Sequence, residues 1–119
     1  MGDDGLSALQ VRIRQFADER DWGQFHTPKN LSMALAGEVG ELIEHFQWLT
    51  PEESAEVMAD PARAGAIGDE LADVLIYLVR LADVLGVDLL AAADRKLAEN
   101  AERYPVEEAR GSAAKAPRR

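Results

Sequence analysis

The sequence predicts an all-α protein, an antiparallel bundle of about five helices, and three observations support this prediction. Apolar residues recur at helical spacing along most of the 119 residues, so that they line one face of each expected helix. Alternation of apolar and polar residues, which is typical of strands, is almost absent. Thr, Asp, Pro and Gly stand at positions where helices are expected to begin or end.

These terminal signals give the helix boundaries. Thr50 can cap a short helix, because Pro51 suits its first turn and Glu53 can complete a capping box. Gly86 and Pro105 are stop signals for the two helices that precede them. The expected helices cover about residues 6–20, 28–48, 50–60, 61–85 and 88–103.

The helix expected over residues 61–85 is apolar on two sides. Ile76 and Val79 lie opposite its main stripe, so this helix needs an apolar partner on each side. We therefore expect a homo-oligomer, a dimer or a tetramer, that is built partly on the second face. The main stripe consists of Ile67, Leu71, Val74, Leu78, Leu81 and Leu85.

Composition favours a single globular domain, since 47% of the residues are hydrophobic. The chain contains no cysteine, so a disulfide framework is excluded. We see no signal peptide and no apolar stretch of membrane-spanning length, and we expect a cytoplasmic protein without a membrane partner. Residues 1–105 are expected to form the domain, and residues 106–119 a flexible basic tail.

Charge is distributed unevenly along the chain, whose net charge is -9. Residues 1–109 hold all 22 acids and only 9 of the 13 bases, a net charge of -13 for this part. Such an acidic body repels the phosphates of nucleic acids, so we expect no nucleic-acid partner. An anionic substrate would need metal cations as a bridge. The remaining bases are Arg110, Lys115, Arg118 and Arg119.

Two acidic pairs form the main candidate site. Glu38 and Glu41 lie one turn apart on the second expected helix, and Glu70 and Asp73 on the fourth. At 100° per residue, each pair lies at the edge of its helix's apolar stripe, where carboxylates repel one another unless a cation binds. Mg²⁺ or Mn²⁺ suits such oxygen ligands. With 22 acids in the chain, solvated or salt-bridged carboxylates remain the alternative.

The residues that follow the acids repeat at equal offsets on the two helices. His45 and Trp48 follow Glu38 by 7 and 10 positions, and Tyr77 and Arg80 follow Glu70 by the same offsets. Gly37 and Gly40 flank Glu38, although glycine inside a helix costs about 1 kcal/mol relative to alanine. We therefore expect a neighbouring helix or a ligand to approach the backbone closely there.

Two segments resemble the MazG-like family of all-α nucleoside triphosphate pyrophosphatases. Residues 34–44 contain Glu-x-x-Glu and residues 68–77 contain Glu-x-x-Asp, the two motifs of the family in their order, and here the spacer between them is 28 residues. Residues 20–31, 46–48 and 100–105 are similar to the dCTP pyrophosphatase branch. The resemblance implies a helical bundle that assembles as dimers or tetramers, with sites near the subunit interfaces.

The resemblance also implies an activity and its residues. The expected reaction is Mg²⁺-dependent cleavage of a deoxynucleoside triphosphate, dCTP or a modified dCTP, to the monophosphate and pyrophosphate, with Mn²⁺ as a substitute metal. The metal ligands would be Glu38, Glu41, Glu70 and Asp73, and our hypothesis is that Glu38 or Glu41 also activates the attacking water. The implied substrate-binding residues are Trp22, Phe25, His26, Trp48, Tyr77, Lys96, Asn100, Arg103 and Tyr104.

Some features depart from this pattern or leave alternatives open. Ile13 and His45 differ from the residues expected in the branch, and Ile13 puts the base preference in doubt. Phe25 is equally well suited to the core. A di-iron bundle is disfavoured, because neither acidic helix supplies Glu-x-x-His. A catalytically inactive nucleotide sensor or helical interaction module is the other alternative, and the four intact acids argue against it.

Overall fold

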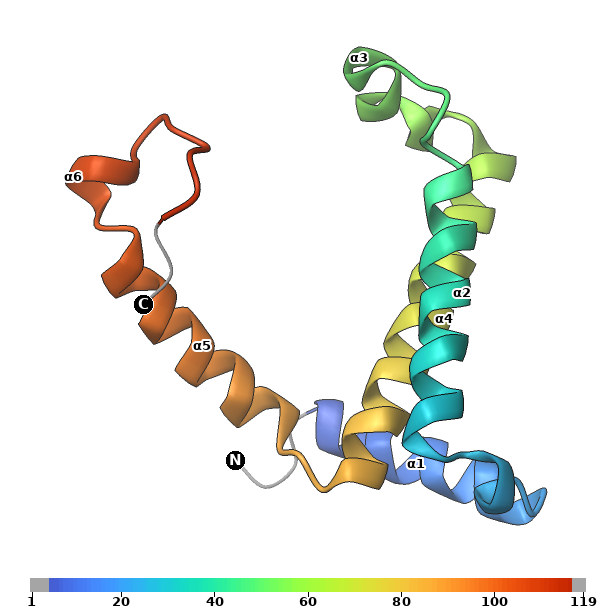
Figure 1. Ribbon diagram of the computed structural model, residues 1–119. Coiled ribbons are helices and arrows are strands. Elements are labelled where there is room, and N and C mark those ends of the chain that lie inside the picture. Colours follow the sequence, from blue (N-terminus) through green and yellow to red (C-terminus); the bar gives the residue numbers. More distant parts are fainter. Residues whose placement is uncertain (1–4, 117–119) are drawn as a thin grey trace. The chain divides into compact units, whose positions relative to one another are not determined.

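The computed structural model describes residues 5–116, and within that range it contains helices and no strand, as predicted (Figure 1). The chain divides into two compact units, with the boundary in the sequence between Gly86 and Val87, and each unit is described by itself. In the described part, no helix is both long and apolar enough to cross a membrane. The elements are α1 (Gly5–Glu19), η1 (Gly23–Phe25), α2 (Pro28–Glu44), α3 (Pro51–Ala55), η2 (Val57–Ala59), α4 (Pro61–Leu85), α5 (Leu89–Arg103) and α6 (Val106–Ala109).

The predicted helix ends are confirmed at most positions, because the capping side chains act locally. Thr50 and Glu53 form the capping box, with hydrogen bonds of 3.1 and 2.9 Å between each side chain and the other residue's N–H. Asp60 and Asp88 cap α4 and α5 with their carboxylates. Gly86 ends α4 with φ at 71°, a left-handed conformation that favours glycine.

The end of α2 differs from the prediction, since the helix stops at Glu44 and does not reach Trp48. The N–H groups of His45 and Phe46 donate to carbonyls three residues earlier, at 3.2 and 2.9 Å. These tighter turns replace the α-helical pattern. Trp48 therefore does not continue the helix face that carries Glu38.

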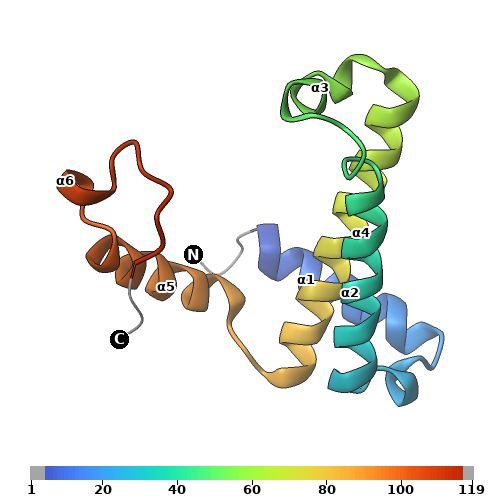
Figure 2. The same ribbon diagram turned by 45° about the horizontal axis from the view of Figure 1, so that its top comes forward.

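The first unit is organised around α2 and α4, which run antiparallel and side by side in both ribbon views (Figures 1 and 2). α1 packs against the C-terminal part of α4. Ala17 of α1, Leu31 of α2, and Ile67 and Val79 of α4 supply buried apolar side chains from all three helices. This packing holds the acidic pairs of α2 and α4 on facing helices.

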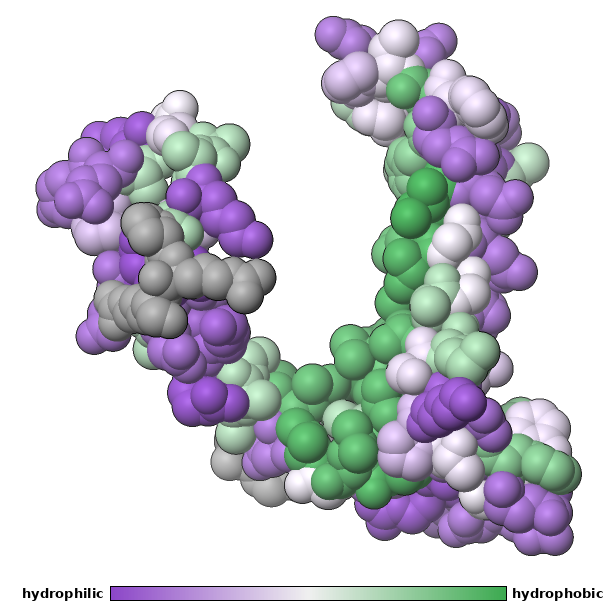
Figure 3. Space-filling view, viewed as in Figure 1, coloured by the Kyte–Doolittle hydropathy of each residue, from purple (hydrophilic) through white to green (hydrophobic). Residues whose placement is uncertain are grey.

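The two predicted apolar sides of α4 are each covered only in part by the packing of the first unit. Val79, which the sequence places on the second face, is 2% exposed, because it packs within the first unit. Leu71, Leu78 and Leu85 of the predicted inner stripe are 53%, 37% and 54% exposed. Figure 3 shows apolar side chains gathered along the α2–α4 pair. Ile67 of that stripe is 3% exposed, whereas Ile76 of the second face is 39% exposed, so each of the two apolar sides has buried and exposed residues.

The second unit consists of α5, α6 and the segment after them. The described part of the expected flexible tail contains α6, and its Ala116 is bonded back to the end of α5. Ala116 accepts a hydrogen bond from Arg103 at 3.2 Å and donates one to the Tyr104 hydroxyl at 3.0 Å. Residues 117–119 lie outside the described part, and the domain boundary at 105 stays a prediction.

Candidate functional site

Three carboxylates meet between α2 and α4, and we call them the carboxylate cluster. Glu38, Glu41 and Glu70 each offer one oxygen, and these oxygens lie within 4.8 Å of one another. Glu38 and Glu41 are one turn apart on α2, and the antiparallel packing brings Glu70 of α4 beside them. Asp73 is exposed and is not one of the three, although its charge acts on the pKa of Glu38.

The acids of the cluster repel one another and are partly withdrawn from water. Burial first, and then hydrogen bonding with Glu70 and Glu41 and the charges of Glu41 and Asp73, together raise the pKa of Glu38 to about 7. Glu38 Oε2 and Glu70 Oε2 are buried and accept no hydrogen bond among the described residues. Buried oxygens of this kind need a partner, and a divalent cation supplies one.

The glycines beside Glu38 do not receive a neighbour from their own chain. A Cβ atom added at Gly37 or Gly40 would meet no heavy atom within 4 Å among the described residues. No neighbouring helix among the described residues therefore approaches this backbone, and the expected approach of a ligand stays a prediction. The space next to these two residues on α2 is open.

An aromatic segment lies between α1 and α2 and includes η1. The Trp22 ring packs edge-on against Phe16 of α1, with 5.6 Å between the ring centroids, and against His26 at 6.2 Å. Trp22 is 41% exposed, and Phe25 is 58% exposed. Phe25 is therefore not part of the core of this chain, which leaves the substrate-lining interpretation.

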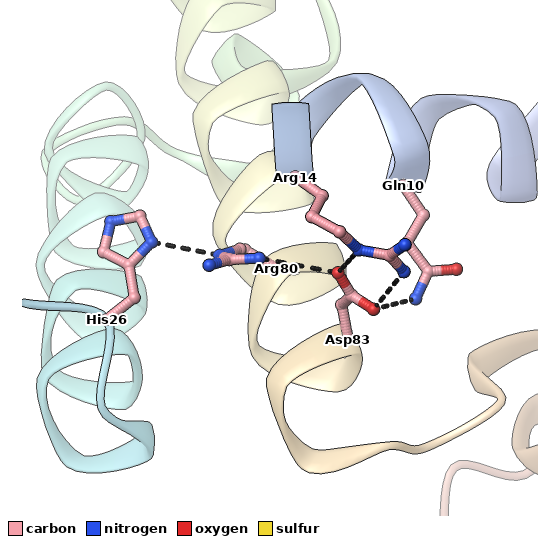
Figure 4. A network of polar contacts seen from close by, with 5 residues as sticks. All are labelled: Gln10, Arg14, His26, Arg80 and Asp83. Atoms are coloured by element: carbon pink, nitrogen blue, oxygen red, sulfur yellow. Dashed lines mark hydrogen bonds and ion pairs between the residues drawn. The ribbon is translucent and has the colours of Figure 1, made fainter. Parts of the chain in front are cut away.

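Arg80 of α4 is bonded to His26 and Asp83. Its Nε donates a hydrogen bond of 3.0 Å to His26 Nδ1, and its Nη1 lies 3.5 Å from Asp83 Oδ2. Asp83 also binds Arg14 of α1 (Figure 4). Sequence analysis missed this network, because its only local signal is the spacing of Arg80 and Asp83, three residues apart on one helix.

The three ring residues that follow the acids at equal offsets belong to the first unit: Trp48, Tyr77 and His45. Trp48 stands beyond the end of α2 and is 87% exposed, which is unusual for a tryptophan. Tyr77 of α4 and His45, just after α2, are half-buried. These positions leave the rings of Trp48 and Tyr77 accessible to a ligand.

The four predicted residues of the second unit lie at the C-terminal half of α5 and just after it. Lys96 is exposed, and Asn100 is half-buried. Arg103 and Tyr104 hold Ala116, and Arg103 Nε is buried without a hydrogen-bond partner among the described residues. Their expected role in binding the substrate stays a prediction.

Comparison with known proteins agrees with this geometry. Residues 34–116 match the model of the MazG-like family. Over 101 residues the chain is 52% identical to proteins named dCTP pyrophosphatase 1 from rat and human, an alignment that covers 85% of this chain and 59% of each relative. The chain thus spans about three fifths of the length of these relatives. A crystal structure of a pyrophosphatase from Archaeoglobus fulgidus superposes with a TM-score of 0.79 at 40% identity, covering 87% of this chain and 94% of that one.

Proposed function

Because the chain belongs to the MazG-like family, we propose that it is a Mg²⁺-dependent pyrophosphohydrolase of deoxynucleoside triphosphates, with dCTP or a modified dCTP as substrate. The observation that carries this proposal is the carboxylate cluster, in which two buried oxygens, of Glu38 and Glu70, have no hydrogen-bond partner among the described residues. The names of the rat and human relatives support dCTP as the substrate.

The acidic residues have two roles in the proposed reaction, binding of the cation and activation of the attacking water. Glu38, Glu41 and Glu70, together with Asp73, would hold the cation, for which Mn²⁺ is a substitute. When bound, Mg²⁺ neutralises charge on the triphosphate and lowers the pKa of the attacking water. Glu38 or Glu41 also orients that water and accepts its proton.

The nucleotide's two ends make different demands on the protein. Trp22, with Phe25 beside it, offers exposed aromatic surface on which a base can stack. Trp48 and Tyr77 offer further ring surface on the first unit. Lys96 and Arg103 carry the positive charge that a leaving pyrophosphate needs, and Asn100 and Tyr104 lie beside them in the sequence. A cytoplasmic location stays a prediction.

We further propose that the protein is a homo-oligomer, a dimer or a tetramer, with its sites near the subunit interfaces. Leu71, Leu75, Leu78 and Leu85 of α4 are between 37% and 54% exposed, and they lie within one sector of the helix. A soluble helix rarely leaves such a stripe in water. Light scattering tests this, since Leu78→Glu is expected to dissociate the assembly, and an unchanged mass would contradict the proposal.

The function is tested by measuring pyrophosphate release from dCTP, 5-methyl-dCTP, dUTP and dTTP, with and without Mg²⁺. We expect release only with Mg²⁺ and fastest with a cytosine nucleotide. Glu41→Gln should abolish turnover without unfolding the helices, whereas Glu52→Gln on exposed α3 should not. Full activity of Glu41→Gln would refute the site, and nucleotide binding without any pyrophosphate release would indicate a sensor.

A further inference from the structure

A polar network joins three separate parts of the first unit (Figure 4). Arg14 of α1 donates two hydrogen bonds to the Asp83 carboxylate, at 2.9 and 2.7 Å, and Gln10 donates a third at 2.9 Å. On its other side, Asp83 lies 3.5 Å from Arg80 Nη1. Arg80 Nε in turn donates to His26 Nδ1 at 3.0 Å. The network thus leads from α1 through α4 to the segment that precedes α2.

Arg80 is a charged residue at a buried position of α4. It is 8% exposed, and it is the one charged side chain that is buried among the described residues. A buried guanidinium is strongly destabilising unless its charge and its N–H groups are paired. Asp83 supplies the charge, and its pKa is lowered, first by the hydrogen bond from Arg14. The Nε–H group of Arg80 donates its hydrogen bond to His26.

This hydrogen bond fixes the protonation state and the orientation of the His26 ring. Because Nδ1 accepts a hydrogen bond from Arg80, it carries no proton, and the neutral ring holds its proton on Nε2. Burial, and then the charge of Arg80, lower the pKa of His26, so the neutral form is kept. The ring of His26 packs edge-on against Trp22, with 6.2 Å between the centroids.

We propose that Arg80, paired with Asp83, is a positioning residue that holds His26 and thereby presents the Trp22 ring to the nucleotide base. This inference rests on the proposed function, which assigns the base to the Trp22 segment. It accounts for the burial of a charge at a position where α4 otherwise buries apolar side chains, such as Val79 and Ala82. The hydrogen bonds of Arg80 are to His26 and Asp83, so we expect its loss to act on binding of the base and not on the chemical step.

Matched arginine variants separate this role from a purely structural one. Arg80→Met removes the contact with His26, whereas Arg14→Met removes an arginine from the same Asp83 carboxylate without touching His26. In the full-length enzyme we expect Arg80→Met to raise KM for dCTP about tenfold while kcat changes by less than about twofold. Arg14→Met should lower Tm and leave KM within about twofold of the wild-type value. Equal KM values for the two variants would overturn the inference.

A fluorescence measurement tests the same link without relying on activity. The chain has two tryptophans, so Trp48→Phe leaves Trp22 as the only one. We expect Arg80→Met in this background to make quenching of Trp22 by acrylamide about twofold more efficient, since the ring loses its support. Unchanged quenching in a folded variant contradicts the inference. If the wild-type protein hydrolyses no nucleotide, the proposed function fails, and this measurement still decides whether Arg80 positions Trp22.

If Arg80→Met does not fold, His26→Leu provides the second test, because it leaves the ion pairs of Asp83 in place. We expect increased quenching of Trp22 in this variant too, by about twofold. A Trp22 ring that remains equally protected would show that His26 does not support it, and the inference would be wrong.

Discussion

The affinity of the carboxylate cluster for Mg²⁺ is expected to rise with pH up to about pH 7 and to level off above it. The reason is Glu38, whose pKa is raised to about 7 by burial and by its acidic neighbours. A metal ligand must lose its proton before it binds. At lower pH, Mg²⁺ therefore competes with the proton on Glu38.

The size of the effect follows from that pKa. With a pKa of about 7, Glu38 is protonated in about ten of eleven molecules at pH 6 and in about one of eleven at pH 8. Apparent affinity for Mg²⁺ should then be about tenfold weaker at pH 6 than at pH 8. A carboxyl group with the ordinary value of 4.5 would be ionised at both, and the affinity would hardly change.

Isothermal titration calorimetry with MgCl₂ measures both the affinity and the proton that is released. Titrations at each pH in two buffers with different ionisation enthalpies give the number of protons, which should be about 0.9 at pH 6 and about 0.1 at pH 8. A titration of ¹³C-labelled glutamates without metal should place the midpoint of Glu38 near 7.

Equal Mg²⁺ affinities at pH 6 and pH 8, with no proton released at either, would refute this reasoning. Glu38→Gln is the control for the source of the proton. The variant should bind Mg²⁺ more weakly, and its residual affinity should no longer change across this range. A pH dependence that persists in Glu38→Gln would assign the proton to another residue.

Three further predictions concern stability and the base. Without metal, the raised pKa of Glu38 contributes stability to the fold below pH 4.5, and this contribution is lost as pH rises through 7. The free energy of unfolding in urea should therefore decline with pH, and Glu38→Gln should remove this decline. Thr50→Ala should reduce the free energy of unfolding by about 1 kcal/mol, because the capping box is lost; no change would contradict that role. Trp48→Ala should leave the free energy of unfolding within about 0.5 kcal/mol, since the ring is 87% exposed, but raise KM for dCTP; an unchanged KM would remove Trp48 from the site.

The elements that sequence predicts well are those fixed by neighbouring residues. The starts of α3, α4 and α5 follow from Thr50, Asp60 and Asp88, each of which bonds to an N–H two or three residues later. The end of α4 follows from Gly86 for the same reason. Helical spacing also places Glu38 and Glu41 of α2 and Glu70 of α4 on facing edges, whereas Asp73 is exposed and is not part of the carboxylate cluster.

The features that sequence does not predict depend on contacts between distant residues. Residues 45–48 contain no glycine or proline, so they give no sequence signal for the end of α2. Both sides of α4 are apolar, and only the packing of α1 and α2 decides that Val79 is buried and Leu71 is exposed. The bond between Arg80 and His26 joins residues 54 positions apart. Helical periodicity contains no information about such a pair.

The measurement that tests the central claim most directly is ³¹P NMR of dCTP incubated with the protein and Mg²⁺. We expect dCMP and pyrophosphate to form in equal amounts, chelation of Mg²⁺ to stop the reaction, and Glu41→Gln not to catalyse it. Formation of dCDP and orthophosphate, or turnover that continues without a divalent cation, would contradict it.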